Sequence, residues 1–372
     1  MKRKCKNVDI TNIKFIENAI QDCLNHKTHK KLLKRGYYDL IDMHGDDHGI
    51  ALQLQKEIKE RCLELPPVRY VDIVDSSNGK QRTLTVEHIK QQFYDYIAFH
   101  GLAELYSRFG YYQINVREHG SPIMACRYVQ SWMNDKDVKY VVQMDIKKCY
   151  PSITHENMMG WLRKHVKNDD LLWLIEQLLS TCDIGLPIGS RLSINLCALY
   201  LSDIYHHIES HYYTFRKGKK RRIFKHVLFY LDDVFLFGSN ARQMRKATND
   251  LIQVYARYGL TIKSDWKLIC LKYNRKHTHI DVLGYKVYHN RVTMRHRDYI
   301  KTRRAIRMCK RHPKSLRFAQ GLVSLYGLFV KHTTSEKFKL KYNAKKYFKQ
   351  AKEMISKYGK SLVYETPRTC NC

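Results

Sequence analysis

The segment His226-Val-Leu-Phe-Tyr-Leu-Asp-Asp-Val-Phe-Leu-Phe237 places two adjacent carboxylates between two apolar runs. Short runs of this kind, rich in Val and aromatic residues, predict two buried strands, so the acids would lie at the turn between them. Burying or half-burying two like charges at such a turn is costly without a cation. We therefore interpret Asp232 and Asp233 as candidate functional side chains.

A third acid has the same setting. The run Tyr140-Val-Val-Gln-Met-Asp145-Ile predicts a short buried strand that ends in a carboxylate. Three carboxylates at strand ends would hold two Mg²⁺ ions roughly 3.5–4 Å apart, which activate a 3′-hydroxyl and stabilise a leaving pyrophosphate. Each acid taken alone is better explained as a turn cap, so this interpretation depends on their combination.

Two other Asp-Asp pairs have simpler explanations. Asp46-Asp47 lies among His and Gly and predicts a solvated turn, whereas Asp169-Asp170 precedes an apolar helical stretch and predicts a helix N-terminus.

The composition predicts a folded, polyanion-binding protein. The 372 residues include 67 Lys and Arg against 35 Asp and Glu, a formal net charge of +32, together with 44% hydrophobic residues and 27 Tyr. Disordered basic tails do not reach this apolar share, and the length predicts two or three packed units. Nucleic acid is the expected partner, ahead of an anionic membrane surface.

Cellular context follows from features that the sequence lacks. No apolar run approaches the ~18 residues needed to span a bilayer, and the start lacks the apolar stretch of a signal peptide. We expect a cytoplasmic protein without a membrane partner, whose eleven cysteines are reduced thiols.

The positive charge is concentrated in two places. Residues 291–372 contain 22 Lys and Arg against four acids, a local net charge of +18. A second cluster, Arg216-Lys-Gly-Lys-Lys-Arg-Arg222, lies between two apolar segments. This cluster is either a solvated hairpin or loop tip, or a phosphate contact.

Periodicity predicts a mixed α+β chain. Helices are expected over 9–64, with a loop at 44–49, and over 87–108, 151–179, 191–210 and 241–258, and through most of the segment after 290. Strands are expected at 69–74 and 82–86, around the turn Asn78-Gly79, at 140–146 and 226–237, and within 260–290.

These segments, taken in order, resemble the reverse transcriptase family over roughly residues 66 to 335. The family's Tyr-x-Asp-Asp hairpin is matched by Phe229-Tyr-Leu-Asp-Asp-Val234 and its first palm motif by Val142-Gln-Met-Asp-Ile-Lys-Lys-Cys-Tyr-Pro-Ser-Ile153. Later motifs are similar to Gly185-Leu-Pro-Ile-Gly-Ser-Arg-Leu-Ser193, Gly259-Leu-Thr-Ile-Lys-Ser-Asp-Trp-Lys267 and Val282-Leu-Gly-Tyr-Lys286. Any one motif is weak evidence, but their common order makes chance very improbable.

The resemblance implies an α+β right-hand polymerase with fingers, an antiparallel palm sheet with packed helices, and a helical thumb. The expected boundaries are 1–65 for an N-terminal helical extension, 66–140 for fingers, 141–290 for the palm and 291–372 for the thumb and tail. Asp145, Asp232 and Asp233 would be catalytic and bind two Mg²⁺ ions, with Mn²⁺ as a candidate substitute.

The resemblance also implies a nucleotide site. Lys80 and Arg82, in the finger hairpin segment Gly79-Lys-Gln-Arg-Thr-Leu84, would neutralise the triphosphate. Tyr150 would exclude a ribose 2′-hydroxyl, and Ile188 and Gly189 would lie against the base pair. Either Lys263 or Lys267 would protonate pyrophosphate, and we favour Lys263. Taken singly, these lysines are also explained as surface charges, and Tyr150 as a core residue.

The C-terminal part of the resemblance concerns nucleic-acid binding. Leu283, Gly284 and Tyr285 would form the primer grip, and the basic helices would contact backbone phosphates through the residues Arg295, Arg297, Arg303 and Arg304. The implied partners are an RNA template, a DNA or RNA primer and dNTPs, with an accessory protein or a structured noncoding RNA as a further candidate.

Departures from the family pattern bear on its biological role. Many members carry Gln at the position of Ile188, and an aliphatic residue there is typical of diversity-generating retroelement and related prophage enzymes. The segments around Leu260 and Ile280, and Ser324-Leu-Tyr-Gly-Leu328, resemble the same branch. Ser193-Ile194 and the longer N-terminus keep antiphage defence reverse transcriptases as an alternative.

Two other functions are alternatives to a reverse transcriptase. An RNA-dependent RNA polymerase shares the paired acids but usually needs a polar group where Tyr150 stands. A catalytically silent RNA-binding scaffold is what the net charge alone would predict.

Overall fold

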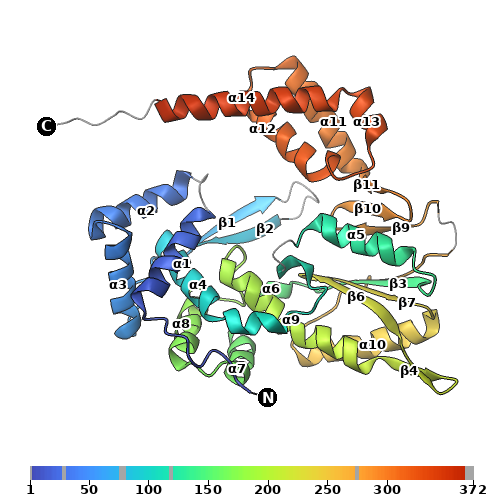
Figure 1. The fold of residues 1–372 in the computed structure, drawn as a ribbon, viewed down its shortest axis with the longest axis horizontal. Coiled ribbons are helices and arrows are strands. Elements are labelled where there is room, and N and C mark those ends of the chain that lie inside the picture. Colours follow the sequence, from blue (N-terminus) through green and yellow to red (C-terminus); the bar gives the residue numbers. More distant parts are fainter. Residues whose placement is uncertain (1, 27–30, 75–80, 117–119, 273–275, 365–372) are drawn as a thin grey trace. The chain divides into compact units, whose positions relative to one another are not determined.

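The computed structural model describes residues 2–26, 31–74, 81–116, 120–272 and 276–364. The chain forms two compact units (Figure 1). Unit 1 contains Met1–Gly120 and Lys139–Ile269, and unit 2 contains Ser121–Val138 and Cys270–Cys372. These units do not coincide with the four expected segments, because residues 121–138 pack with the C-terminal part of the chain.

Three helices open unit 1: α1 (Ile13–Asn25), α2 (Lys31–His44) and α3 (Asp47–Lys59). The side chain of Asp46 accepts a hydrogen bond from the backbone N–H of Gly49, so this residue caps α3, and Asp47 lies in its first turn. The solvated turn expected for this acidic pair is confirmed for Asp46, which is exposed in the bend between α2 and α3, and is wrong for Asp47, which is helical.

The two strands expected at 69–74 and 82–86 are confirmed by β1 (Arg69–Val74) and β2 (Gln81–Val86), which pair antiparallel. Its turn, including Lys80, lies outside the described residues. Helix α4 (Ile89–Gly101) follows, and the rest of the helix expected over 87–108 is a 3₁₀ helix, Ala103–Arg108. A second short 3₁₀ helix spans Ile114–Val116.

A four-stranded sheet forms the centre of unit 1. Its strand order is β6-β7-β3-β8, and its members are β3 (Tyr140–Asp145), β6 (Phe224–Tyr230), β7 (Asp233–Gly238) and β8 (Lys267–Cys270). The pairs β6–β7 and β7–β3 are antiparallel. Every residue from Val234 to Gly238 on β7 is buried, so both faces of the sheet are covered. The expected buried strands on either side of Asp232 and Asp233 are confirmed.

Five helices complete unit 1: α6 (Cys149–Ser152), α7 (His155–His165), α8 (Asp169–Ser180), α9 (Arg191–His211) and α10 (Ala241–Arg257). Asn168 caps α8, and Asp169 and Asp170 occupy its first turn, which confirms the helix start expected there. The basic cluster at 216–222 falls on a hairpin of β4 (Tyr213–Arg216) and β5 (Lys219–Arg222).

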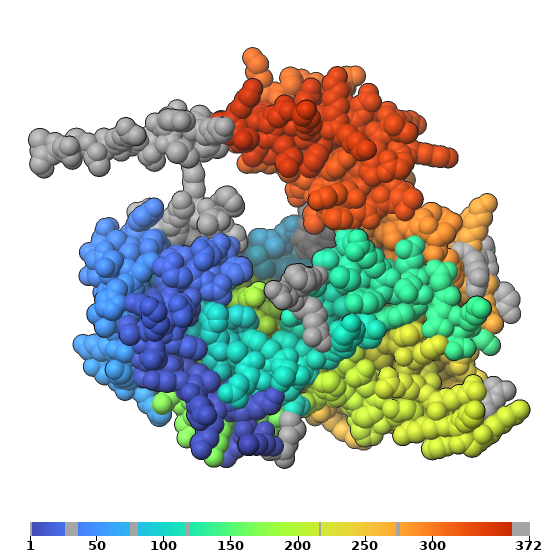
Figure 2. Space-filling view, viewed as in Figure 1, coloured from blue at the N-terminus to red at the C-terminus, as the bar shows by residue number. Residues whose placement is uncertain are grey.

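Unit 2 combines a small sheet with a group of helices. Helix α5 (Pro122–Met133) packs on a sheet of order β11-β10-β9, made of β9 (His279–Val282), β10 (Tyr285–Tyr288) and β11 (Val292–Met294). The helices are α11 (His296–Arg311), α12 (Leu316–Leu325), a π-helical turn Tyr326–Val330, α13 (Glu336–Lys341) and α14 (Ala344–Tyr364). Their shared core includes Leu322, Val330 and Phe338. Figure 2 shows the outer surface of these helices in orange to red.

The antiparallel sheets and their helices confirm the expected α+β fold class. The nine described cysteines are all free thiols, and Cys370 and Cys372 lie outside the described residues. Among the helices that the structure describes, none is long and apolar enough to cross a bilayer.

Candidate active site

The sheet of unit 1 brings the three predicted acids to one end of its strands. In the antiparallel register, Asp145 at the end of β3 lies opposite Asp233 at the start of β7. Asp232 occupies the turn between β6 and β7, and its carbonyl accepts a hydrogen bond of 3.1 Å from the N–H of Ile146. The strand register and this hydrogen bond thus place the backbone of all three acids at the same end of the sheet.

The turn that carries Asp232 needs outside support. Leu231 has a φ of 54°, a left-handed conformation that is unfavourable for a residue with a branched side chain. Its N–H donates a hydrogen bond of 3.3 Å to Oδ1 of Asn115. Sequence reasoning missed Asn115, because a single amide outside any strand or helix pattern gives no signal.

Asp145 has two unlike carboxylate oxygens. Its Oδ2 accepts a hydrogen bond of 2.5 Å from Nζ of Lys263, and the Lys263 N–H donates to the Asp145 carbonyl at 3.0 Å. Its Oδ1 is buried and has no hydrogen-bond partner among the described residues. A buried carboxylate oxygen without a partner is costly, so this atom is suited to a cation.

The electrostatics connect Asp232 to the same place. Burial raises the pKa of Asp232 above its ordinary value, and the negative charge of Asp145 adds to that rise. Lys263 and Arg82 act in the opposite direction and lower it. The structure therefore brings Arg82 of β2, Lys263, Asp145 and Asp232 into one electrostatic neighbourhood.

The fit of a divalent cation to these acids is partial. Within the described ranges, no three or more His, Cys, Asp or Glu side chains are arranged to hold a metal ion. Asp145 and Asp232 are close enough to raise a pKa by mutual repulsion, and Asp145 retains one oxygen without a partner. These two carboxylates fit a hard cation, and the contribution of Asp233, which pairs with Asp145 across the sheet, stays a prediction.

Tyr150 lies beside this neighbourhood on α6. Its half-buried ring packs against the core of unit 1, and burial raises the pKa of its hydroxyl far above the ordinary value, with Asp232 among the lesser causes. Its carbonyl accepts a hydrogen bond of 3.0 Å from the N–H of Leu186. Tyr150 is thus both a packed residue and a neighbour of the acids.

The turn Leu186–Gly189 is joined to the β1–β2 hairpin. The N–H of Thr85 on β2 donates to the Ile188 carbonyl at 3.0 Å. Gly189 has a φ of 120°, and a Cβ there would lie 3.1 Å from the Thr85 carbonyl oxygen, so both backbone and space favour glycine. Ile188 is half-buried and Gly189 is exposed, which leaves this turn accessible beside β2.

A buried pair fixes the helix that follows the turn. Ser190 caps α9, and its hydroxyl donates a hydrogen bond to Oδ2 of Asp95 on α4. Both residues are buried. Sequence reasoning missed Asp95, because the residue lies inside a helix and its partner is 95 positions away.

The predicted primer grip lies in unit 2, at the turn between β9 and β10. Leu283 and Gly284 have φ values of 50° and 95°, as a two-residue hairpin turn with two left-handed residues requires. The Tyr285 hydroxyl donates a hydrogen bond to the Leu328 carbonyl, and its ring contacts Phe329. The grip segment is therefore held by the π-helical turn Tyr326–Val330.

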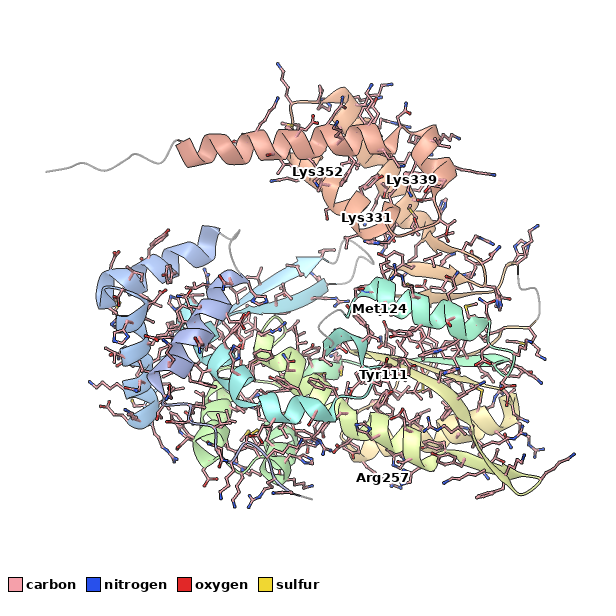
Figure 3. The ribbon with its side chains drawn as sticks, in the orientation of Figure 1. Tyr111, Met124, Arg257, Lys331, Lys339 and Lys352 are labelled. Atoms are coloured by element: carbon pink, nitrogen blue, oxygen red, sulfur yellow. The ribbon has the colours of Figure 1, made fainter. Side chains whose placement is uncertain are left out.

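The four predicted phosphate-binding arginines differ in availability. Arg297 and Arg304 on α11 are exposed. Arg295 is held by Asp281, with its Nε 2.9 Å from Oδ2, and half-buried Arg303 contacts the hydroxyl of Tyr342. Figure 3 labels three further cations of unit 2, Lys331, Lys339 and Lys352. The exposed arginines are thus better placed to meet phosphate than the two that have protein partners.

Comparison with known proteins gives one family match. The family described as reverse transcriptase (RNA-dependent DNA polymerase) matches residues 56–287, more than half of the chain. The COX1/OXI3 intron 2 protein of Saccharomyces cerevisiae is 24% identical over 182 residues, which are 46% of this chain and 21% of that protein. The chain therefore spans about a fifth of the length of this curated relative.

Among solved structures, the telomerase of Candida albicans in complex with a TWJ fragment of telomeric RNA is similar at 12% identity with a TM-score of 0.45. The similarity covers 79% of this chain and 60% of that one. On the family match, this chain belongs to the reverse transcriptase (RNA-dependent DNA polymerase) family, whose members are nucleotidyltransferases.

Proposed function

We propose that the chain is an RNA-directed DNA polymerase that copies an RNA template into cDNA from a DNA or RNA primer. The observation that carries this proposal is the meeting of Asp145 and Asp232 at the strand ends, beside Lys263 and Arg82. An RNA-binding scaffold would have no need to bring two mutually repelling carboxylates together, because doing so costs stability.

Each residue has a defined task in the proposed reaction. Two Mg²⁺ ions, or Mn²⁺ in their place, would activate the primer hydroxyl and stabilise the leaving group, and Asp145 and Asp232, with Asp233 as the third proposed ligand, would hold them. Arg82 would neutralise the triphosphate, together with Lys80, which lies outside the described residues. Lys263 would hold a proton close to where pyrophosphate departs.

Sugar choice is proposed to depend on Tyr150. Its ring, packed beside the acids, would occupy the space of a ribose 2′-hydroxyl and exclude rNTPs by contact. Recognition of rNTPs would instead require a polar group placed to bind that hydroxyl. A preference for rNTPs in the assay below would therefore favour an RNA-dependent RNA polymerase.

The proposed biological role is in a diversity-generating retroelement, with antiphage defence as the alternative. The aliphatic side chain at Ile188 supports the first role, because it cannot hydrogen-bond the nucleotide as an amide does. A repeated template and target sequence beside the gene would support diversification, and toxin-like neighbours would support defence. The same proposal includes a cytoplasmic location. It also includes an accessory protein or a structured noncoding RNA as a further partner.

The catalytic proposal is tested by primer extension. Purified protein, a primed RNA template, dNTPs and Mg²⁺ should give extended DNA, and Asp232→Asn should reduce the rate by roughly 1000-fold, since metal-held charge stabilisation is worth several kcal/mol. Asp42→Asn removes one exposed carboxylate from α2 and should leave the rate unchanged. Equal extension by wild type and Asp232→Asn would refute the assignment.

A second test concerns template checking. Ile188→Gln introduces an amide at the turn beside β2. This variant should lower misincorporation opposite template bases several-fold, because a hydrogen bond discriminates more strongly than an aliphatic contact. Sequencing of cDNA made by both proteins measures the misincorporation spectrum. An unchanged spectrum would remove the link between this position and fidelity.

A further inference from the structure

The hairpin β4–β5 of unit 1 carries a concentrated positive charge that the proposed reaction does not use. From Tyr212 to Arg222 the sequence contains six Lys and Arg and no acid. All four residues of β5, Lys219 to Arg222, are exposed. The hairpin projects beside α10 (Figure 1).

The two faces of this hairpin differ in chemistry. Side chains of directly paired residues share a face, and the register pairs Tyr213 with Arg222 and Phe215 with Lys220. One face therefore interleaves two aromatic rings with two cations. Nζ of Lys220 lies 4.0 Å from the centroid of the Tyr213 ring, a cation–π contact that fixes part of this face.

Phe215 is the most unusual member of the aromatic face. Its ring is 74% exposed although it is a large apolar side chain. A single exposed apolar residue on a surface is common, but this one lies opposite Lys220 on a strand whose partner carries four consecutive cations. An exposed ring among cations suits a ligand with both flat bases and phosphates.

The hairpin is firmly attached at its base, so it can present these side chains in a fixed geometry. Tyr212 is buried and its hydroxyl donates to Oδ2 of Asp250 at 2.8 Å. The Tyr213 hydroxyl donates to the Glu209 carbonyl at 2.8 Å, and Nε2 of Gln243 on α10 donates to Oγ1 of Thr214 at 3.2 Å. At the tip, Lys217 and Gly218 both have positive φ, as a tight hairpin turn requires.

Helix α10 extends the positive surface. Its exposed residues Arg242, Arg245 and Lys246 belong to the turns next to Gln243, which contacts the hairpin. One carboxylate at this base, Asp250, is engaged by Tyr212. The surface formed by β4, β5 and the first turns of α10 is hereafter called the basic ribbon surface.

We propose that the basic ribbon surface binds single-stranded RNA, with Phe215 stacking on an unpaired base and the cations of β5 contacting the neighbouring phosphates. An RNA strand is the favoured occupant because the chain belongs to an RNA-dependent polymerase family, and stacking on an exposed ring requires a base outside a duplex. This site is additional to the template–primer contacts of the proposed reaction and does not depend on catalysis.

The test measures binding of a fluorescent 20-nucleotide oligouridine to the full chain without dNTPs. The quadruple variant Lys219→Gln, Lys220→Gln, Arg221→Gln, Arg222→Gln should bind at least about ten-fold more weakly at 0.15 M salt, and its log–log salt slope should be shallower by about 2 to 3. A matched control, Lys56→Gln, Lys59→Gln, Lys164→Gln, Lys167→Gln, removes four exposed cations from α3 and the α7 region of unit 1. Equal losses in both variants would mean that only net charge matters and would overturn the proposal.

A second variant separates stacking from charge. Phe215→Ala should weaken binding about five-fold or more with the salt slope unchanged, and Phe215→Trp should retain binding. Photocrosslinking with 4-thiouridine RNA should label residues of the hairpin in the wild type. The proposal fails if Phe215→Ala binds the single strand like the wild type. It also fails if the four substitutions in β5 weaken binding of the full chain to duplex RNA or to anionic phosphatidylserine vesicles more than binding to the single strand.

Discussion

Two ion pairs of unit 1 and the exposed arginines on α11 of unit 2 place their charges in opposite surroundings. In unit 1, the ion pairs Asp145–Lys263 and Glu57–Lys90 are at least half-buried. The cations of unit 2 that were expected to bind phosphate include exposed side chains on α11, such as Arg297 and Arg304.

This difference has an energetic meaning. A buried charge that loses its partner is strongly destabilising, so a single substitution in a buried ion pair of unit 1 should have a large effect. An exposed charge is screened by water and salt, so each exposed cation on α11 should contribute little to nucleic-acid binding by itself. The binding free energy should instead come from the sum of many such phosphate contacts.

The largest effect on stability is expected at the pair Glu57–Lys90. Lys90 Nζ lies 2.6 Å from Glu57 Oε1, and the two side chains are only 9% and 4% exposed. Lys90→Met should lower the free energy of unfolding by about 3–5 kcal/mol, because it leaves the Glu57 carboxylate buried and unpaired. Urea denaturation measures the change.

The matched control is an exposed pair in the same unit. Arg163 and Glu176 approach to 2.8 Å, but their side chains are 57% and 48% exposed. Arg163→Met should cost less than about 1 kcal/mol. Similar losses in the free energy of unfolding from the two substitutions would show that burial does not determine how much these ion pairs stabilise the protein.

The same buried carboxylate should make stability depend on pH. Burial alone would raise the pKa of Glu57, but hydrogen bonds from Lys90, Gln53 and Tyr94 outweigh it, so the pKa lies below its ordinary value. A lowered pKa in the folded state stabilises the protein above the unfolded pKa and loses that contribution as the pH falls. Wild-type stability should therefore decline below about pH 4.5, and Glu57→Gln should flatten the decline.

The smallest effect per residue is expected in unit 2. The double variant Arg297→Gln, Arg304→Gln should weaken binding of an RNA–DNA template–primer by about ten-fold and make the salt slope shallower by 1 to 2. Arg163→Gln, Lys164→Gln removes two exposed cations from α7 as a control. Fluorescence anisotropy at several salt concentrations measures both quantities. An unchanged slope would show that these arginines do not meet phosphates.

Much of the central sheet of unit 1 could be predicted from the sequence because its signals are local. The apolar runs around Asp145 and Asp232 specify strands, and the acids then fall at their ends. The left-handed Gly284 and the hairpin at 216–222 also follow from neighbouring residues.

Features that join distant segments could not be predicted in the same way. Lys263 contacts Asp145 across 118 positions, and Asn115 supports Leu231 across 116. Helix α5 did have a local signal, since Ser121 caps it and Pro122 begins it, but that signal does not reveal that α5 packs in unit 2. Arg295 was expected to bind phosphate, and its ion pair with Asp281 depends on how β9 and α11 meet.

The most direct test compares the two kinds of charge in one experiment. Single-turnover extension rate and template–primer affinity are measured in parallel for Asp145→Asn and for Arg297→Gln, Arg304→Gln. We predict that Asp145→Asn loses roughly 1000-fold in rate and retains affinity, whereas the arginine variant loses affinity and retains the rate at saturating template–primer. If Asp145→Asn extends primers at the wild-type rate, the assignment of chemistry to the strand ends is contradicted.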